Sequence, residues 1–233
     1  MQEIRYAMVD GEKVPVLISD ENEALQAAKA ARRAIVGLWR EDGKENEWCA
    51  DTLITDVEDA DEEFLERIAR RHLGLPWTIC ETERLILREI AERDYEEIVK
   101  NHVDDGLDTA EKIAGYTKRH YEVFEFGFWA VEEKKSGNLT GIVGFRIPQD
   151  DDIGDVDYYV LSLDDENILD DTLELGYHIF PEYRRKGYAK EACRAAIEYA
   201  EEEFGTVQFI VRIGKENIVS KKVAESLGFV RTE

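Results

Sequence analysis

Basic residues are scarce in this chain of 233 residues. It has 30 lysines and arginines against 53 aspartates and glutamates, which gives a net charge of −23. A field of this sign repels phosphate backbones and anionic lipid surfaces, so nucleic-acid and membrane partners are disfavoured. No apolar run approaches the roughly 18 residues of a spanning helix. The first residues, MQEIRYAMVDGEKV, lack the basic and apolar regions of a signal peptide. We therefore expect a cytoplasmic protein.

Cysteine and histidine are also rare, and neither is spaced for chemistry. The chain has three cysteines and four histidines: Cys49, Cys80, Cys193, His72, His102, His120 and His178. The odd number of cysteines and the absence of a CxxC pair argue against a disulfide framework or a zinc site. The histidines lack ligand spacing, so we expect no metal. The glycine fingerprints GxxxxGK[ST] and GxGxxG are absent as well.

The remaining composition is that of a folded protein. Hydrophobic residues make up 43% and aromatic residues 10%, which excludes a disordered chain. At roughly 150 residues per domain, the length predicts one standard domain and a smaller one. Gly74-Leu75-Pro76 ends a helical pattern, because proline cannot continue a helix. We place the boundary there and predict domains 1–76 and 77–233.

Alternating strand and helix patterns predict an α/β protein of mixed, α+β character. In the first domain, expected strands at 13–18, 34–39 and 52–56 frame helical segments, as in a small Rossmann-like βαβ unit. In the second, strands are expected at 83–90, 126–131, 140–147, 173–180 and 207–213, and helices at 187–204 and from Asn217. Aspartates followed three residues later by glutamate predict four helix starts: Asp20, Asp59, Asp94 and Asp108.

One segment differs in composition from the rest. Residues 150–171 contain ten acidic residues and no basic one. One interpretation is a solvated insertion between two strands. The other is a rim that attracts cations.

The most informative stretch is LELGYHIFPEYRRKGYAK, residues 173–190. An expected strand ends at Phe180-Pro181, and three consecutive cations then lead through Gly187 into an alanine-rich helix. A helix N-terminus offers unpaired amides and a positive dipole end, and a glycine lets the backbone approach an anion closely. This pattern indicates a phosphate or pyrophosphate site, although arginine and lysine at a helix start can also be mere surface residues.

Arg184-x-x-Gly187-x-Ala189 resembles the [RQ]-x-x-G-x-[GA] pyrophosphate loop of the GNAT superfamily of acetyl-CoA-dependent N-acetyltransferases. Three flanking motifs, in the expected order, resemble its ribosomal-protein-alanine-acetyltransferase-like branch: Thr82 to Arg88, Trp129 to Gly144, and Asn217-x-x-Ser220 followed by Leu227-Gly228-Phe229. The resemblance covers about residues 80–233. It implies the GNAT fold, with a central mixed sheet, for the second domain.

The resemblance also implies roles for individual residues. The pyrophosphate would bind to amides of the loop, the pantetheine arm to the backbone at the strand end, and the α-helical Asn-x-x-Ser motif would lie beside the same cleft. The implied cofactor-binding residues are His178, Ile179, Phe180, Arg184, Arg185, Lys186, Gly187, Tyr188, Ala189, Lys190, Asn217 and Ser220. Asn217 is also a good helix N-cap in any fold.

The catalytic residues expected from the resemblance are Glu174 and His178. Glutamates at the strand position of Glu174 act as general base in parts of the family. The backbone amide of His178 is a candidate for polarising the thioester carbonyl, and its imidazole titrates near neutrality. Many members carry a tyrosine general acid seven residues after the asparagine, where this chain has Ala224.

Two further departures concern the ends of the chain. The family usually adds a strand after Gly228-Phe229; truncation, or an edge supplied by another chain, would explain its lack here. Residues 1–76 weakly resemble the second half of a haloacid-dehalogenase-like (HAD) domain, without that family's DxDxT strand. We interpret them as a catalytically silent accessory domain with a role in regulation or homodimerisation.

The sequence therefore predicts an enzyme that transfers an acetyl group from acetyl-CoA to a primary amine by direct attack in a ternary complex. The acidic segment at 150–171 favours a cationic small-molecule or peptide amine as the acceptor. The alternative is a catalytically weak acyl-CoA-binding regulatory protein.

Overall fold

The computed structural model describes residues 1–40, 48–103, 105–148, 155–162 and 172–232. The chain divides into two compact units, Met1–Trp77 and Thr78–Glu233. Among the described residues, no helix combines the length and apolar character needed to cross a bilayer.

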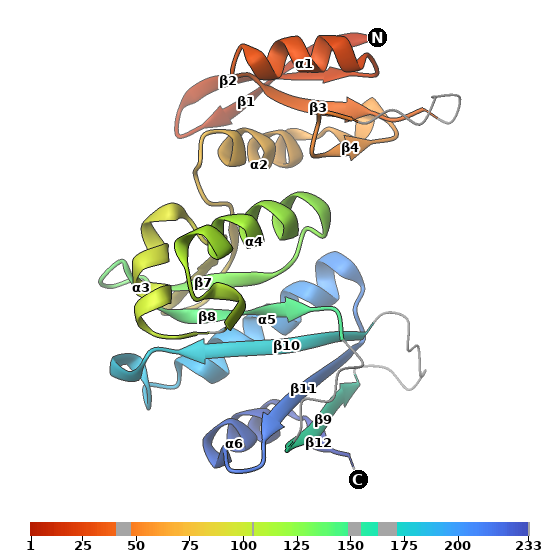
Figure 1. Cartoon of the computed structure of the whole chain (residues 1–233). Helices are drawn as coiled ribbons and strands as arrows, with labels where there is room; N and C mark the ends of the chain where they lie inside the picture. Colours follow the sequence, from red (N-terminus) through yellow and green to blue (C-terminus); the bar gives the residue numbers. More distant parts are fainter. Residues whose placement is uncertain (41–47, 104, 149–154, 163–171, 233) are drawn as a thin grey trace. The chain divides into compact units, whose positions relative to one another are not determined.

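Unit 1 is a four-stranded sheet with a helix on each face (Figure 1). Its strands, in sheet order, are β1 (Gln2–Val9), β2 (Glu12–Ser19), β3 (Ala34–Leu38) and β4 (Leu53–Ile54), and its helices are α1 (Asn22–Ala30) and α2 (Glu62–His72). β1 is antiparallel to β2, whereas β2, β3 and β4 are parallel. The predicted βαβ unit is present as β2–α1–β3.

Strand β1 is an element that the sequence analysis missed. It forms a hairpin with β2 through Asp10 and Gly11, whose φ angles of 50° and 89° are those of a tight hairpin turn. Ala7 and Val9 are buried on one face. On the other face Ile4, Tyr6 and Met8 are 49%, 61% and 50% exposed. β1 is therefore an edge strand with an apolar outer stripe.

Unit 2 is an eight-stranded mixed sheet in the order β12-β9-β11-β10-β8-β7-β6-β5, as the GNAT expectation requires. Its strands are β5 (Thr78–Glu81), β6 (Leu85–Arg88), β7 (Phe128–Glu133), β8 (Asn138–Arg146), β9 (Val156–Ser162), β10 (Thr172–Ile179), β11 (Gln208–Gly214) and β12 (Val230–Arg231). Its helices are α3 (Tyr95–Lys100), α4 (Ala110–Val123), α5 (Tyr188–Phe204) and α6 (Ile218–Leu227). Among the described strands of unit 2, β10 and β11 pair in parallel and the other neighbours are antiparallel. The expected lack of a strand after Gly228-Phe229 is wrong, because β12 follows directly and pairs with β9.

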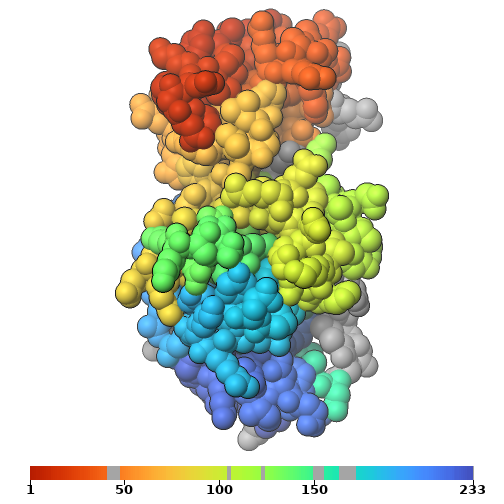
Figure 2. Space-filling model, turned by 90° about the vertical axis from the view of Figure 1, so that its left-hand side faces the viewer, coloured from red at the N-terminus to blue at the C-terminus, as the bar shows by residue number. Residues whose placement is uncertain are grey.

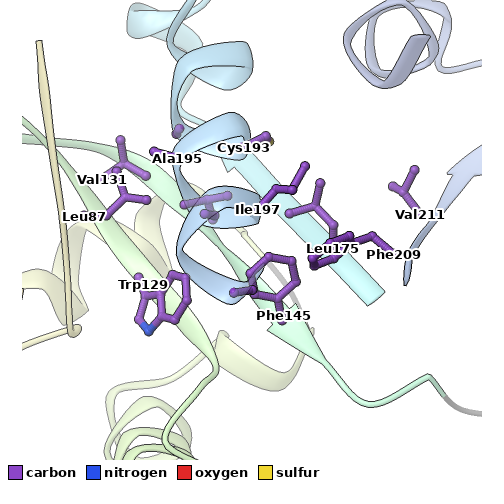
Figure 3. Close-up of a cluster of buried hydrophobic side chains, with 14 of the residues drawn as sticks. Leu87, Trp129, Val131, Phe145, Leu175, Cys193, Ala195, Ile197, Phe209 and Val211 are labelled. Atoms are coloured by element: carbon purple, nitrogen blue, oxygen red, sulfur yellow. The ribbon is translucent and has the colours of Figure 1, made fainter. Parts of the chain in front are cut away.

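The main core of unit 2 lies between the sheet and α5. Figure 3 shows Cys193, Ala195 and Ile197 of α5 among side chains of the sheet, including Phe145, Leu175 and Phe209. A second cluster, with Ile98, Ile113 and Ile142, packs α3 and α4 on the opposite face. Helix α5 and the pair α3 and α4 therefore cover opposite faces of the sheet. Because successive side chains of a strand point to opposite faces, successive residues of β10 face different helices.

The acidic segment at 150–171 is not a simple insertion, which corrects one of the two interpretations given above. Its residues 156–162 form β9, which pairs with β11 and β12. Asp157 forms ion pairs with Lys221 and Arg231. Most of the other acids lie outside the described residues.

Candidate functional site

A cleft opens where β10 and β11 stop pairing. Their parallel pairing covers only Thr172↔Gln208 to Glu174↔Ile210. Residues of both strands line a cavity of about 210 Å³. The start of α6, and Val103 after α3, form the rest of its lining. Its lining includes Phe128, Arg146, Glu174, Gly176, Tyr177, His178, Arg212, Gly214, Asn217 and Ser220.

The sheet register decides which backbone groups of β10 face this cleft. The Phe180 amide donates to the Thr140 carbonyl at 2.9 Å, so it is used within the sheet. In the antiparallel ladder with β8, where His178 lies opposite Ile142, even-numbered residues direct their backbone groups toward β8. The amides of His178 and Phe180 are therefore not those that face the cleft, which corrects the sequence-based prediction. The groups of Tyr177 and Ile179 point to the side of β11.

The loop after β10 ends in an uncapped helix N-terminus. Arg185 and Gly187 both have left-handed backbones, with φ of 63° and 85°, and Gly187 is the N-cap of α5 without a side-chain hydrogen bond. The loop and its cations are exposed (Figure 2, cyan to light blue). Left-handed residues before a helix turn successive N–H groups toward one point, which favours an anion. Residues Arg185 to Lys190 thus form a turn whose geometry suits an anion, and this segment is called the anion-binding turn below.

Arg184, the first residue of the predicted loop motif, contacts the end of β10. Its Nε donates to the Ile179 carbonyl at 2.8 Å, so the side chain closes the end of β10. The Arg184 side chain therefore shapes the turn from the strand side.

Arg84, before β6, holds the other side of the turn. It donates to the Lys186 carbonyl at 2.8 Å, and its guanidinium lies 4.8 Å from the centre of the Tyr188 ring. It also forms an ion pair with Glu191 in the first turn of α5, and Thr82 donates to the same carboxylate at 2.6 Å. The sequence reasoning counted Arg84 only as part of a strand motif.

Glu174 is buried, and both of its carboxylate oxygens accept hydrogen bonds from arginine side chains. Arg212 donates to both carboxylate oxygens, at 3.0 and 2.6 Å, and Arg146 donates to Oε1 at 2.6 Å. The Glu174 and Arg212 side chains are only 3% and 4% exposed. Both oxygens of the Glu174 carboxylate are therefore already used in charge-assisted hydrogen bonds with arginine side chains.

His178 lies on the same face of β10 with opposite surroundings. Its Nε2 is buried and has no hydrogen-bond partner among the described residues, although the side chain lines the cleft. Burial, and then the nearby positive charge of Arg184, lower the pKa of His178 below its usual 6.5. The imidazole is therefore neutral at pH 7 and can accept a proton.

The far wall of the cleft is the first turn of α6. Asn217 caps the helix by accepting the Ser220 amide at 3.1 Å, as its local N-cap role requires. The Tyr177 hydroxyl donates to the Ser220 carbonyl at 3.2 Å. Burial raises the pKa of Tyr177 to about 12. Ala224 is buried one turn further along the helix.

The structure therefore brings together Glu174, His178, Asn217 and Ser220 at the cleft. The predicted loop residues continue from the end of β10. Sequence reasoning missed Arg146 and Arg212, although each is a lone cation inside an apolar strand, in GIVGFRI and QFIVRIG. Among the described residues, no group of three or more histidine, cysteine, aspartate or glutamate side chains is placed to hold a metal.

Known proteins resemble this chain over the region that contains the cleft. The family model described as "Acetyltransferase (GNAT) domain" matches residues 84–230. Two Bacillus subtilis proteins, both described as uncharacterised N-acetyltransferases, are similar. YnaD is 26% identical over 64% of this chain and 81% of its own, and YoaA 27% identical over 65% and 82%. A solved Bordetella pertussis structure assigned to the GNAT acetyltransferases has a TM-score of 0.50 and 19% identity, over 65% of this chain and 87% of that one.

Proposed function

The chain belongs to the GNAT acetyltransferase family and is an acetyltransferase, and we propose that it transfers an acetyl group from acetyl-CoA to a primary amine by direct attack in a ternary complex. The supporting observation is the divergence of β10 from β11 directly before an uncapped, left-handed turn into α5. The proposal includes the ribosomal-protein-alanine-acetyltransferase-like branch, on the motifs around Asn217 and Gly228.

The chain offers groups that fit acetyl-CoA along its length. The pyrophosphate would bind to amides of the Arg185 to Lys190 turn. The pantetheine arm would run along β10 and bind to the backbone of Tyr177 and the amide of Ile179, which lie beyond the pairing of β10 with β11. A thioester carbonyl near the Tyr177 amide would receive a hydrogen bond as charge develops on its oxygen.

We assign the proton acceptor to His178. The amine nitrogen attacks the thioester carbon, the C–N bond forms, the C–S bond breaks, and the nitrogen loses a proton to Nε2. The sulfur leaves as a thiolate. Because an ordinary thiol has a pKa of about 8.5, solvent can supply its proton near neutral pH. The reaction therefore does not depend on a tyrosine at the position of Ala224.

Glu174, the other expected catalytic residue, is better suited to positioning. Its ion pairs with Arg146 and Arg212 join β8, β10 and β11 at the point where the cleft begins. It would fix the spacing of the strands rather than move a proton.

The described residues that line this cleft belong to unit 2. We propose unit 1 as an accessory domain with the HAD-like ancestry considered above. A cationic acceptor, a homodimer and a cytoplasmic location stay predictions of the sequence. The alternative role, a weakly catalytic acyl-CoA-binding regulator, is favoured only by the engagement of Glu174 and by Ala224.

A substitution at Gly187 tests the cofactor site. Gly187→Glu places a negative side chain at an anion-binding turn whose backbone has φ of 85°. We expect CoA affinity, measured by calorimetry, to fall at least about tenfold. Gly205→Glu is a matched control, because Gly205 caps the other end of α5 with φ of 66° and open space around it.

Unchanged CoA affinity in Gly187→Glu would contradict the proposed site. Thiol release from acetyl-CoA in the presence of a panel of amines separates the two functions: CoA binding without amine-dependent thiol release would favour the regulator.

A further inference from the structure

Two guanidinium groups bind the carboxylate of Glu174 in the cleft. Arg212 and Glu174 form a buried pair through two hydrogen bonds. Arg146 makes a third, single bond to the same Glu174 oxygen. Its side chain is 41% exposed, in contrast to its two buried neighbours. The guanidinium of Arg146 is therefore accessible from the cleft, with N–H groups beyond the one that binds Glu174.

Arg146 lies on the same face of the sheet as His178, the proposed base. Glu174, which lies opposite Arg146, and His178 are both even-numbered residues of β10 and share its α3/α4 face. Glu174 and His178 are four residue steps apart along the strand, which is about 13 Å between their Cα atoms. Both line the cleft, so a single bound molecule can reach both.

An apolar step separates the two polar ends. Gly176 lies between Glu174 and His178, and a Cβ atom there would be 2.6 Å from the ring of Phe128. The ring therefore packs directly on the strand and lines the cleft. In order along β10, the cleft is lined by the guanidinium of Arg146, the ring of Phe128 and the side chain of His178.

We propose that the acceptor is a small amine that also carries a carboxylate, with the carboxylate bound by Arg146, the chain between lying on Phe128, and the amine at His178. The amine end rests on the proposed function, whereas the carboxylate end does not. In a protein with a net charge of −23, a partly exposed guanidinium in the cleft gives a carboxylate a local binding partner of opposite charge. The negative field of the protein also favours the positive charge of an amine. The expected acceptor therefore has both a positive and a negative group.

Pairs of compounds that differ by one charge test this proposal. Amino acids with the amine and the carboxylate separated by one to six methylene groups are compared with their carboxamides, which keep the amine and the length. Binding to the CoA-saturated protein is measured by calorimetry. We expect the acid to bind at least about tenfold tighter than its amide at one best length.

Variants of Arg146 assign the effect. Arg146→Gln should remove the preference for the acid, and Arg146→Lys should retain part of it, because lysine keeps the charge but not the planar fork. Arg119→Gln, at an exposed position of α4, is the matched control for the loss of one positive charge and should keep the preference. CoA affinity measured in each variant shows that the cleft is folded.

Equal affinity for acid and amide at every length, including no measurable binding of either, would overturn the proposal. So would a preference that survives in Arg146→Gln. Thiol release measured on the same compounds keeps the two proposals apart. A preference for the acid without turnover would support the carboxylate site at Arg146 and contradict acetyl transfer; equal binding with turnover would support acetyl transfer and contradict the carboxylate site.

Discussion

Glu174 and His178 share one face of one strand, yet their surroundings give them opposite chemistry. The carboxylate has three charge-assisted hydrogen bonds, and the imidazole has a buried nitrogen with no partner among the described residues. A group whose hydrogen-bonding capacity is already used stabilises structure; a group with spare capacity can bind or react. This contrast supports His178 as the base.

The assignment predicts a pH dependence. Only the neutral imidazole accepts a proton, and burial and Arg184 lower the pKa of His178 below 6.5. As pH falls through this lowered pKa, kcat/KM should therefore fall in proportion to the neutral fraction of the His178 imidazole. His178→Gln should lower turnover by roughly 10²-fold and remove this acid limb, while leaving CoA affinity unchanged.

Glu174→Gln is the contrasting variant. It should lower activity or stability through loss of the ion pairs, but it should keep the acid limb of the pH profile. An acid limb that disappears in Glu174→Gln and persists in His178→Gln would return the role to the carboxylate.

Residue identities at the site could be predicted from the sequence only where a local pattern defines them. The turn from Arg184 to Ala189 has a fixed spacing, so its position was predictable, as was the N-cap role of Asn217. The engagement of Glu174 was not, because its partners Arg146 and Arg212 come from two other strands. The orientation of the His178 amide likewise depends on the register with β8.

Helices were predicted more accurately than the residues that begin them. The four Asp-x-x-Glu patterns do mark four helical regions, but the N-caps of α1, α2 and α4 are Glu21, Asp61 and Thr109. Asp94 does precede α3, yet its carboxylate bonds to Arg88 instead of capping the helix. Acidic residues are so frequent in this chain that the pattern fixes a helix start only to within two residues.

The bond between Arg88 and Asp94 attaches α3 to the sheet. Arg88 of β6 donates to both oxygens of Asp94, at 2.6 and 2.8 Å, and both side chains are buried. Arg88→Met leaves a buried carboxylate without its main partner. We expect the free energy of unfolding in urea to fall by about 3–5 kcal/mol.

The control for this prediction is Lys100→Met, which removes an exposed partner of Glu97 on α3 and should leave stability unchanged. A loss in Arg88→Met no larger than the loss in the control would show that the buried pair contributes little.

At the scale of the whole molecule, the two units have separate hydrophobic cores. All the residues of the cleft and of the anion-binding turn belong to unit 2. A chain that begins at Trp77 should therefore fold, bind CoA with unchanged affinity and retain turnover. Circular dichroism, calorimetry and thiol release check these three points. Loss of turnover in a folded fragment would give unit 1 a part in catalysis.

The outer stripe of β1 has a colloidal consequence. An edge strand with exposed Ile4, Tyr6 and Met8 is a template on which another strand can assemble, and proteins usually protect such edges with charge. Here that protection is not in the stripe itself. The net charge of −23 supplies it at a distance, since like-charged molecules keep apart at low ionic strength. The negative charge of the chain thus also opposes aggregation, and the distance over which this repulsion acts shortens as the salt concentration rises.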